Sequence, residues 1–506
     1  MITVVSNLEQ FEIDTRGLVM AFYPGESISF VVDERFEVRD DDSFEDNLDD
    51  ILKCDAFKKN ENTICIGICW NADGRSVSVM VIDGTEEDVY ISSESYNGSR
   101  VGAKSAVKRC IYYMLSETAD KNLPWGTLTG IRPTKIPMDL LERGYPTTSA
   151  IRYMINEHLV SFEKAQLATE IAERERKLLS KIDYDRGYSL YIGIPFCPST
   201  CLYCSFTSYP ISMYKARVDE YLDCLEKEIR FTAERFKDRH LNSIYIGGGT
   251  PTTLEPEQLD RLCTMVETSF DLSHLLEFTV EAGRPDSLTR EKLLAIKKHR
   301  VDRISINPQT MKEETLRIIG RHHTVQDVKD AFHMARDVGF DNINMDLILG
   351  LPDETYEDVE HTMKEIYELS PDNLTVHSLA LKRSSRLNIE HEQYEKYMYE
   401  NSQELMDLTA DYAARMGMVP YYLYRQKNMA GNLENVGYCR RGKAGLYNIL
   451  IMEEKQSIVA LGAGATSKAV YKDGSIKRAE NVKDIDQYIS RIDEMIERKK
   501  ALYDKE

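Results

Sequence analysis

Three cysteines near the middle of the chain have a spacing that suits metal binding. Cys197, Cys201 and Cys204 form the pattern CxxxCxxC, and they directly follow a short apolar run that is typical of a β-strand. Three thiolates this close together can wrap one iron–sulfur cluster. Ferredoxin-type clusters take a further cysteine ligand, so this set would leave one iron open to a chelating ligand.

Zinc is the alternative metal, because closely spaced cysteines also suit tetrahedral zinc sites. The chain offers no additional ligand at a characteristic zinc spacing, since Cys224 and Cys263 fall in helical patterns without a neighbouring Cys or His. The pattern therefore favours the cluster, with zinc left open. Ten cysteines spread over 506 residues also indicate a reducing cytoplasm rather than a disulfide scaffold.

The composition argues against two broad classes of function. A net charge of −20 disfavours an extended nucleic-acid surface, because binding to phosphates depends on accumulated Lys and Arg. The longest apolar stretches are strand-sized and interrupted by polar residues, and the N-terminus lacks the pattern of a secretion signal. We therefore expect a soluble, cytoplasmic protein with no membrane span and no nucleic-acid partner.

Short strands and helices alternate regularly from Gly187 to about Pro371, which predicts a parallel sheet with right-handed crossovers. One face of these strands is apolar, as at Ile192, Ile244 and Val280, and the opposite face is polar. A closed barrel would fill its interior with bulky side chains, so the polar face indicates an open partial barrel that encloses a ligand. A flat doubly wound sheet is the alternative. The six predicted strands are 190–194, 243–247, 277–281, 303–307, 342–349 and 373–377.

Changes in pattern divide the chain into three predicted domains, and the predicted fold class is α/β. Residues 1–182 show apolar alternation around Ile66 and Val79 and then helical patterns, including one at 148–179, which predicts an α+β domain. Residues 183–385 hold the strand–helix repeats of the predicted (β/α)6 partial barrel. Residues 386–506 combine a predicted helix near 390–416 with a Tyr-rich segment and a Gly-rich turn. We expect them to form a small domain that covers the substrate.

Several segments resemble the radical S-adenosylmethionine (SAM) superfamily, whose partial barrel carries CxxxCxxC after its first strand. The stretch 190–352 looks like the oxygen-independent coproporphyrinogen III dehydrogenase group within it. The matching pieces include Tyr191 to Cys204, the triple glycine in 247–252, and the run 346–352. Two further segments, 126–135 and 422–428, look like the HemZ-type branch of that group.

The resemblance implies which residues hold the cofactors. Cys197, Cys201 and Cys204 would bind one [4Fe–4S] cluster, and SAM would bind beside it. In this family the glycine-rich segment holds the methionine amino group of SAM. Glu281 and Asp346, which suit ribose hydroxyls, also lie on the predicted polar face. The implied SAM-binding residues are Tyr191, Tyr203, Gly248, Gly249, Thr250, Glu281, Gln309, Arg321 and Asp346.

The resemblance also implies a reaction and its partners. In the dehydrogenases, reductive cleavage of SAM gives a radical that takes hydrogen from propionate side chains of coproporphyrinogen III, and two decarboxylations yield protoporphyrinogen IX. The partners would be this tetrapyrrole and a low-potential electron donor such as flavodoxin or ferredoxin. No catalytic residue is assigned. Candidate cations for the substrate carboxylates are Lys382, Arg383, Arg386, Arg425 and Lys427.

Two positions depart from the family pattern. Gly193 stands where these enzymes carry a histidine, and Ser205 and Phe206 follow Cys204 without the additional cysteine of the well-known dehydrogenase. Both positions concern proton handling and the binding of a second SAM. A haem-binding chaperone and a radical methyltransferase acting on a tetrapyrrole stay open as alternative functions.

Overall fold

The computed structural model describes residues 1–34, 64–70, 74–83, 88–380, 382, 385–390, 394, 401–426 and 432–504. The chain forms two compact units. Unit 1 comprises Met1–Ala172 and Arg425–Leu433, and unit 2 comprises Glu173–Tyr424 and Glu434–Glu506. The three domain ranges stated above stay a prediction.

A mixed five-stranded sheet and two helices form the core of unit 1. The strand order is β2-β1-β3-β4-β5, with β1 parallel to both of its neighbours and the β3–β4 and β4–β5 pairs antiparallel. Ile66 and Val79 are fully buried on β3 and β4, which confirms the predicted alternation. The elements are β1 (Ile2–Ser6), α1 (Glu12–Phe22), β2 (Ile28–Val32), β3 (Ile64–Trp70), β4 (Ser76–Asp83), β5 (Asp88–Ser95) and α4 (Arg100–Thr118).

Three helices follow α4: α5 (Lys135–Glu142), α6 (Thr147–His158) and α7 (Phe162–Leu179). The last two confirm the helical pattern predicted at 148–179. The segment before α5 is joined by Arg425, which is 4% exposed. Its backbone N–H donates to the carbonyl of Ile131 at 2.8 Å, and its Nη1 donates to the carbonyl of Leu128 at 2.5 Å. Within unit 1, Arg425 of segment 422–428 therefore contacts segment 126–135, the other segment that resembles the HemZ-type branch.

A mixed α/β fold with one large, mostly parallel sheet forms unit 2. Its strand order is β14-β15-β13-β12-β11-β10-β9-β6-β16-β17-β18, and the run from β13 to β16 is parallel throughout. All six predicted strands are confirmed, although β11 ends two residues before the predicted boundary. They are β6 (Gly187–Ile194), β9 (His240–Gly248), β10 (Glu277–Glu281), β11 (Arg303–Ser305), β12 (Ile343–Leu349) and β13 (Asn373–Ser378).

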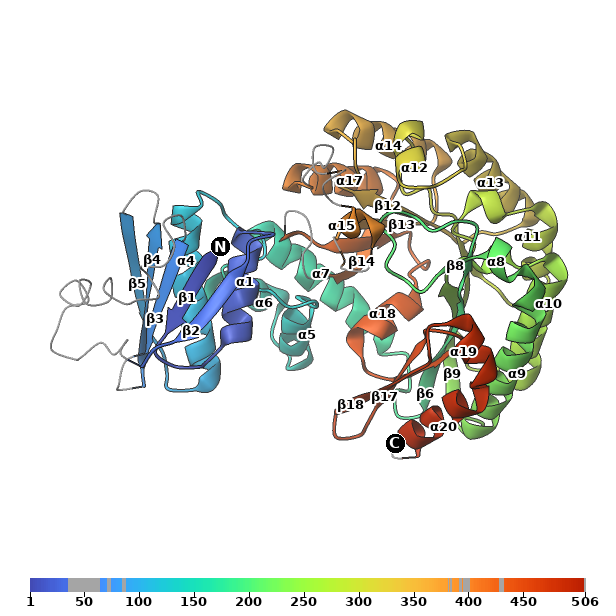
Figure 1. The fold of residues 1–506 in the computed structure, drawn as a ribbon, viewed down its shortest axis with the longest axis horizontal. Helices are drawn as coiled ribbons and strands as arrows, with labels where there is room; N and C mark the ends of the chain where they lie inside the picture. The colour runs from blue at the N-terminus through green and yellow to red at the C-terminus, as the bar shows by residue number, and fades with distance from the viewer. Residues whose placement is uncertain are drawn as a thin grey trace. The chain divides into compact units, whose positions relative to one another are not determined.

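Amphipathic helices alternate with these strands and follow one another around the outer side of the sheet (Figure 1). Helix α9 buries Val218, Tyr221, Leu222, Leu225 and Ile229, the apolar positions that recur at helical spacing in the sequence. Capping boxes define the starts of α13 and α14. The helices are α9 (Val218–Arg235), α10 (Pro256–Ser269), α11 (Arg290–Lys297), α12 (Glu313–Ile318), α13 (Val325–Val338) and α14 (Tyr356–Leu369).

The C-terminal strands extend this sheet at both of its edges. Strand β16 pairs in parallel with β6, and the turn after it passes over Gly193. Gly462 in this turn has φ +94°, and a Cβ there would lie 2.3 Å from the Gly193 carbonyl oxygen. The Gly-rich turn is therefore required by close packing against β6. The strands are β14 (Val419–Tyr424), β15 (Asn435–Cys439), β16 (Ser457–Leu461), β17 (Thr466–Val470) and β18 (Ile476–Glu480).

The predicted helix near 390–416 is observed only in part. Helix α17 covers Gln403–Arg415, and a separate short helix, α15, covers Arg386–Ile389. Residues 391–393 and 395–400 lie outside the described residues. The helical pattern is thus confirmed for its second half.

A buried ion pair ties the C-terminal helix α20 (Ile492–Tyr503) to α9. The side chains of Glu228 and Lys499 are at most 1% exposed, and they pair directly. One Glu228 oxygen also accepts from Asn481 at 2.8 Å, and the other accepts from Tyr488 at 2.7 Å and from the Gly462 N–H at 2.8 Å. Both carboxylate oxygens are thereby satisfied. This cluster is called the α9–α20 cluster below.

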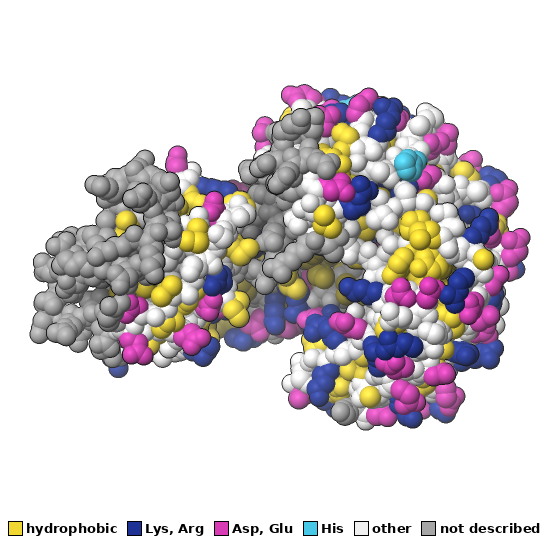
Figure 2. Space-filling model, in the orientation of Figure 1, with side chains coloured by type: hydrophobic (Ala, Val, Ile, Leu, Met, Phe, Trp, Pro, Cys, Tyr) yellow, Lys and Arg dark blue, Asp and Glu magenta, His cyan; other side chains and the backbone are white. Residues whose placement is uncertain are grey.

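Acidic and basic side chains are interspersed over the helices of unit 2 that face the viewer in Figure 2. Some form pairs one helical turn apart, as Lys364 does with Glu360 at 2.9 Å. Such exposed pairs contribute little to stability, about 0.3–0.5 kcal/mol each. Among the described helices, none is long and apolar enough to cross a membrane.

Candidate active site

The cysteine loop begins where the first strand of unit 2 ends. Cys197 closes the two-residue strand β7 (Phe196–Cys197), which follows β6 after one residue. Further along, the N–H of Leu202 donates to the Ile319 carbonyl at 3.0 Å, and the N–H of Leu387 donates to the Leu202 carbonyl at 2.9 Å. The buried Leu202 side chain packs with Ile319 and Leu387. The loop is therefore anchored between its cysteines.

The structure brings the three predicted thiols into one environment. Burial raises the pKa of Cys197 to about 11, and the neighbouring Cys204 and Cys201 add to that effect. Burial also raises the pKa of Cys204. The Cys197 sulfur accepts from the Thr250 hydroxyl at 3.5 Å, and the Cys201 sulfur accepts from Arg284 Nη1 at 3.4 Å. Cys197 and Cys204 therefore keep their protons unless a metal replaces them.

Arg284 is a site residue that the sequence analysis missed. Its side chain is 4% exposed and pairs with Asp286 through two hydrogen bonds of 2.8 and 2.6 Å. Burial by itself would raise the pKa of Asp286, but hydrogen bonds from Arg284 and His323 hold it far below its usual range. Arg284 follows the carboxyl end of β10, where ligands bind in parallel sheets, and that position was the available signal.

The triple-glycine segment lies directly against the cysteine loop. The N–H of Gly249 donates to the Ile194 carbonyl at 2.7 Å, and the N–H of Thr250 donates to the Phe196 carbonyl at 2.6 Å. A Cβ on Gly249 would lie 2.5 Å from the Phe196 carbonyl oxygen, and Gly248 has φ +105°. The neighbouring chain itself thus requires glycine at both positions.

Two predicted carboxylates stand on the polar face with different proton affinities. Burial raises the pKa of Glu281 to about 7, although the Tyr245 hydroxyl donates to it. Burial also works to raise the pKa of Asp346, but His377 and Asn344, the latter at 2.7 Å, hold it below its usual value. Asp346 is therefore ionised at neutral pH, whereas Glu281 is poised between its two forms.

Three stacked tyrosines border this carboxylate pair. Tyr191 on β6 and Tyr245 on β9 have ring centroids 6.2 Å apart and nearly parallel planes. Tyr447, from helix α18 (Leu446–Glu453), stacks on Tyr245 at 4.6 Å. Tyr191 was predicted from the sequence, but Tyr447 was not, because nothing in the sequence links α18 to these strands. The tyrosine stack offers a flat aromatic surface.

Gln309 lies in a strained backbone conformation. Its φ is +67°, which is uncommon for a residue with a side chain. Two backbone hydrogen bonds hold it: its N–H donates to the Asp346 carbonyl at 2.9 Å, and its carbonyl accepts from the Ile348 N–H at 3.0 Å. Its buried Oε1 has no hydrogen-bond partner within the described part of the chain. Gln309 therefore carries a buried, unpartnered acceptor on a backbone that is held against Asp346.

Arg321 links the buried wall of polar residues around Gln309 to the cysteine loop. It is 5% exposed, and its Nη1 donates to the Asn307 carbonyl at 2.5 Å while its Nη2 donates to the Tyr203 hydroxyl at 3.3 Å. Burial opposes its charge, but the neighbouring Tyr203 and Cys201 raise the pKa of Arg321. Its Nε is another unpartnered polar atom, as are Asn307 Oδ1 and Ser305 Oγ, among the described residues.

The candidate cations for substrate carboxylates separate into distinct places. Lys382 lies near Cys204, and burial lowers the pKa of its ammonium group. Arg386 is paired with Glu390 at 3.1 Å. Arg425 belongs to unit 1, where its hydrogen bonds to backbone carbonyls give it a structural role. Outside the described residues lie Arg383 and Lys427.

Known proteins resemble this chain over much of its length. The model of the Radical SAM superfamily matches residues 191–366. An oxygen-independent coproporphyrinogen-III oxidase-like protein, HemZ from Bacillus subtilis (strain 168), is 42% identical over 380 residues, 74% of this chain and 76% of that protein. The haem chaperone HemW of the same organism is 40% identical over 225 residues, 42% of this chain and 58% of that protein.

Among solved structures, coproporphyrinogen III oxidase (HemN) from Escherichia coli, described as a radical SAM enzyme, has a TM-score of 0.49. It shares 24% sequence identity and covers 62% of this chain and 70% of its own. The chain belongs to the radical SAM superfamily and, within it, to the HemZ-type members of the oxygen-independent coproporphyrinogen III dehydrogenase group. Membership of this superfamily implies a [4Fe–4S] cluster and SAM as cofactors.

The residues of the candidate site fit both implied groups. Three thiols converge on one loop beside the arginines 284 and 321, whose charges suit an anionic cluster. The described residues hold no set of three Cys, His, Asp or Glu side chains that closes around a single ion. A [4Fe–4S] cluster does not require the three thiolates to close around a single ion, because each thiolate can bind a different iron. The unpartnered atoms of Ser305, Asn307, Gln309 and Arg321 provide polar partners for a bound ligand.

Proposed function

We propose that this protein catalyses the oxygen-independent oxidative decarboxylation of coproporphyrinogen III to protoporphyrinogen IX. The observation that carries the proposal is a set of three thiols beside a buried wall of unused polar atoms, at the carboxyl ends of parallel strands. Similarity to HemZ, a coproporphyrinogen-III oxidase-like protein, supports the substrate class. The sheet of unit 2 is then the partial (β/α)6 barrel of this superfamily.

In this proposal the cofactors occupy the space between the cysteine loop and the polar wall. Cys197, Cys201 and Cys204 hold the cluster. The cluster and SAM, when bound, supply a carbon-centred radical that accepts a hydrogen atom. The stretch 248–250 and Gln309 offer polar groups to the methionine end, and Arg321 pairs with its carboxylate.

The remaining side chains orient and enclose the adenosyl group. Asp346, ionised at neutral pH, accepts from ribose hydroxyls, and Glu281 does so in its ionised form. Tyr191 faces the adenine as part of the tyrosine stack, and Tyr203 keeps Arg321 in place. Because Tyr447 closes the stack from the C-terminal segment, we expect residues after 434 to help exclude water.

Two propionate groups become vinyl groups. From each, one hydrogen atom passes to the SAM-derived radical, carbon dioxide leaves, and one electron passes to a separate one-electron acceptor. The chain must therefore hold a carboxylate near the site where the hydrogen atom leaves. Lys382, near Cys204, is the described cation best placed for that carboxylate. A low-potential carrier such as flavodoxin or ferredoxin is the proposed electron donor.

Anaerobic turnover tests this proposal. The reconstituted protein is incubated with SAM, a strong reductant and coproporphyrinogen III. We expect carbon dioxide, protoporphyrinogen IX and 5′-deoxyadenosine, and none of these with a Cys201→Ala variant. SAM cleavage without loss of carboxylate, or a methylated tetrapyrrole, would contradict the decarboxylase assignment.

A haem chaperone is the second candidate function, and the 40% identity to HemW over 225 residues favours it. A chaperone would bind haem tightly and pass it to an acceptor protein without consuming SAM. The same preparation, titrated with haem and then mixed with an apo-haemoprotein, separates the two functions. Haem transfer with no decarboxylation would establish the chaperone.

A further inference from the structure

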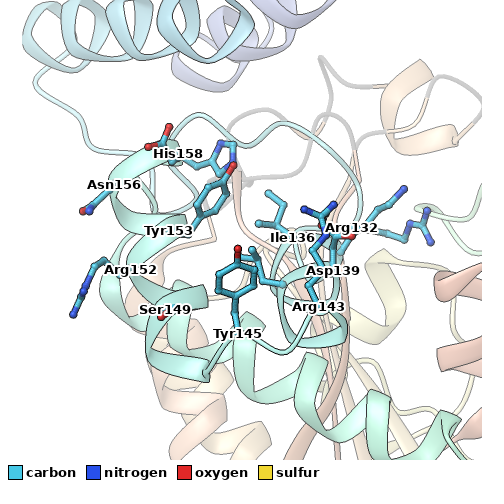
Figure 3. Close-up of a pocket in the computed structure, with 13 residues that line it drawn as sticks. Arg132, Ile136, Asp139, Arg143, Tyr145, Ser149, Arg152, Tyr153, Asn156 and His158 are labelled. Carbon is cyan, nitrogen blue, oxygen red and sulfur yellow. Dashed lines mark ion pairs between the residues drawn. The ribbon is translucent and has the colours of Figure 1, made fainter. Parts of the chain in front are cut away.

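A pocket on unit 1 carries positive charge in an otherwise acidic chain. It has a volume of about 870 Å³ and lies between the end of segment 126–135, α5 and α6 (Figure 3). Four basic and two acidic side chains line it, a formal balance of +2, whereas the whole chain carries −20. They are Arg132, Lys135, Arg143 and Arg152, with Asp139 and Glu157.

The two acidic side chains of this pocket are already neutralised. Asp139 pairs with Arg143 at 2.9 Å, and Glu157 pairs at 3.2 Å with Arg109, which stands outside the lining. Both acids of the lining are therefore paired with residues other than Lys135 and Arg152. Two of them are exposed and make no ion pair with any described residue: Lys135 and Arg152.

Aromatic rings complete the pocket. Tyr145 is 53% exposed and Tyr153 is 42% exposed, which is high for such large rings. Figure 3 shows Tyr145 in the middle of the lining residues, with Asp139 and Arg143 to one side and Ser149 to the other. Exposed rings beside cations favour a ligand that is both flat and anionic.

Arg132 and Lys135 of the pocket end a segment, 126–135, that the proposed chemistry leaves unused and that packs against the end of α6. Gly126 has φ +53°, and a Cβ there would lie 2.1 Å from the His158 carbonyl oxygen at the end of α6. The N–H of Thr127 donates to the same carbonyl at 2.8 Å, and Arg425 braces Leu128 from the other side. A site preformed in this way loses little entropy when it binds.

We propose that this pocket is a second tetrapyrrole site, which binds a planar, carboxylate-bearing ring away from the candidate active site of unit 2. The inference rests on the proposed function for its choice of tetrapyrrole. Arginine forks suit carboxylates, the tyrosine rings suit a conjugated plane, and the volume falls in the usual range of about 300–1,000 Å³ for ligand pockets. The ligand would be an oxidised, fully conjugated porphyrin, because the porphyrinogens of the proposed reaction are not planar.

Binding of coproporphyrin III, a stable and fluorescent tetracarboxylate, tests the inference in the full-length protein. Quenching of the two tryptophans, Trp70 and Trp125, both in unit 1, reports the dissociation constant. The double variant Lys135→Glu/Arg152→Glu should weaken binding about tenfold or more, since two attractive charges become repulsive. The matched control Lys472→Glu/Lys477→Glu, at two exposed positions of the β17–β18 hairpin of unit 2, should leave the constant within about twofold.

A Cys201→Ala variant distinguishes binding in this pocket from binding at the candidate active site. That variant lacks the proposed cluster ligand, yet it should bind the porphyrin with the same dissociation constant. Unchanged binding in the pocket variant, or equal losses in the pocket and control variants with normal thermal melting, would overturn the second site. Porphyrin binding that persists when the unaltered protein shows no turnover would count against the proposed function alone.

Discussion

Unit 2 contains two buried polar clusters that differ in how far their hydrogen bonds are satisfied. In the α9–α20 cluster every oxygen of Glu228 has donors, and the charge of Lys499 is matched directly. In the candidate active site, buried atoms of Ser305, Asn307, Gln309 and Arg321 have no hydrogen-bond partner among the described residues.

The difference shows how a folded chain distinguishes architecture from a binding site. An unpartnered buried polar atom costs about 1–3 kcal/mol, so several of them together are retained only where something else offsets the cost. A complete network has no such need, and it stabilises the fold only while all its members are present. We therefore expect substitutions in the α9–α20 cluster to lower stability. Substitutions of the residues with unpartnered atoms in the candidate active site should weaken ligand binding instead.

The largest expected effect comes from breaking the α9–α20 cluster. Lys499→Met leaves Glu228 buried without its cation, which should lower the free energy of unfolding of unit 2 by about 3–5 kcal/mol. Denaturant titration measures it. The neighbouring Lys500→Met is the matched control, since Lys500 is exposed and its change should stay within about 0.5 kcal/mol.

A compensating variant sharpens this result. Glu228→Gln/Lys499→Met removes both charges, so it should recover part of the lost stability. Equal stability of Lys499→Met and Lys500→Met would show that the pair is not structural.

The next effect is a pH dependence from Glu281. Its pKa is about 7 when folded and 4.5 unfolded, so the unfolded chain releases this proton first as pH rises. Between these values the unfolding free energy should fall with rising pH, by about 3 kcal/mol in all, and Glu281→Gln should remove that slope. Asp346→Asn is a control of opposite sign, because the lowered pKa of Asp346 stabilises the fold at higher pH. Parallel pH profiles of the unaltered protein and Glu281→Gln would refute this assignment.

Arg321 should affect ligand binding more than stability. Arg321→Lys keeps the charge but removes the planar guanidinium group that can bind a carboxylate through two hydrogen bonds. We expect SAM affinity to fall about 10- to 100-fold, which corresponds to the loss of one charge-assisted hydrogen bond. Isothermal titration under anaerobic conditions measures this. Arg317→Lys, on the surface of α12, is the control. If Arg321→Lys unfolds the protein instead, Arg321 stabilises the fold and does not serve ligand binding.

The smallest expected effect concerns the potential of the cluster. Arg284 places a buried cation 3.4 Å from the Cys201 sulfur, which favours the reduced and more negative cluster. Arg284→Met should therefore lower the midpoint potential by about 60 mV, a tenfold change for one electron. A redox titration followed by electron paramagnetic resonance measures it. An unshifted potential, with Arg290→Met as the exposed control, would assign Arg284 to structure alone.

Local patterns predicted much of this molecule, and distant pairings account for the rest. Period-two alternation and helical spacing located six of the seven strands of the parallel run and the helices between them. Strand β16 was missed because its partner β6 precedes it by more than 260 residues, and no local signal encodes that pairing. Tyr447 was missed for the same reason.

The candidate site shows the same division. Cys197, Cys201 and Cys204 follow from spacing within one loop, and Glu281 and Asp346 follow from the polar face of predicted strands. Arg284 was overlooked because an arginine in a loop is ordinarily a solvated cation. Only the fold shows that it is buried against Cys201 and paired with Asp286.

The central claim is that three thiolates hold a cluster with one iron free for SAM. Mössbauer spectra of anaerobically reconstituted, iron-57-enriched protein test it most directly. We expect a [4Fe–4S] cluster in which one iron changes its signal when SAM is added, and loss of that cluster in Cys201→Ala. A spectrum that SAM leaves unchanged, or a preparation that binds zinc in place of iron, would contradict it.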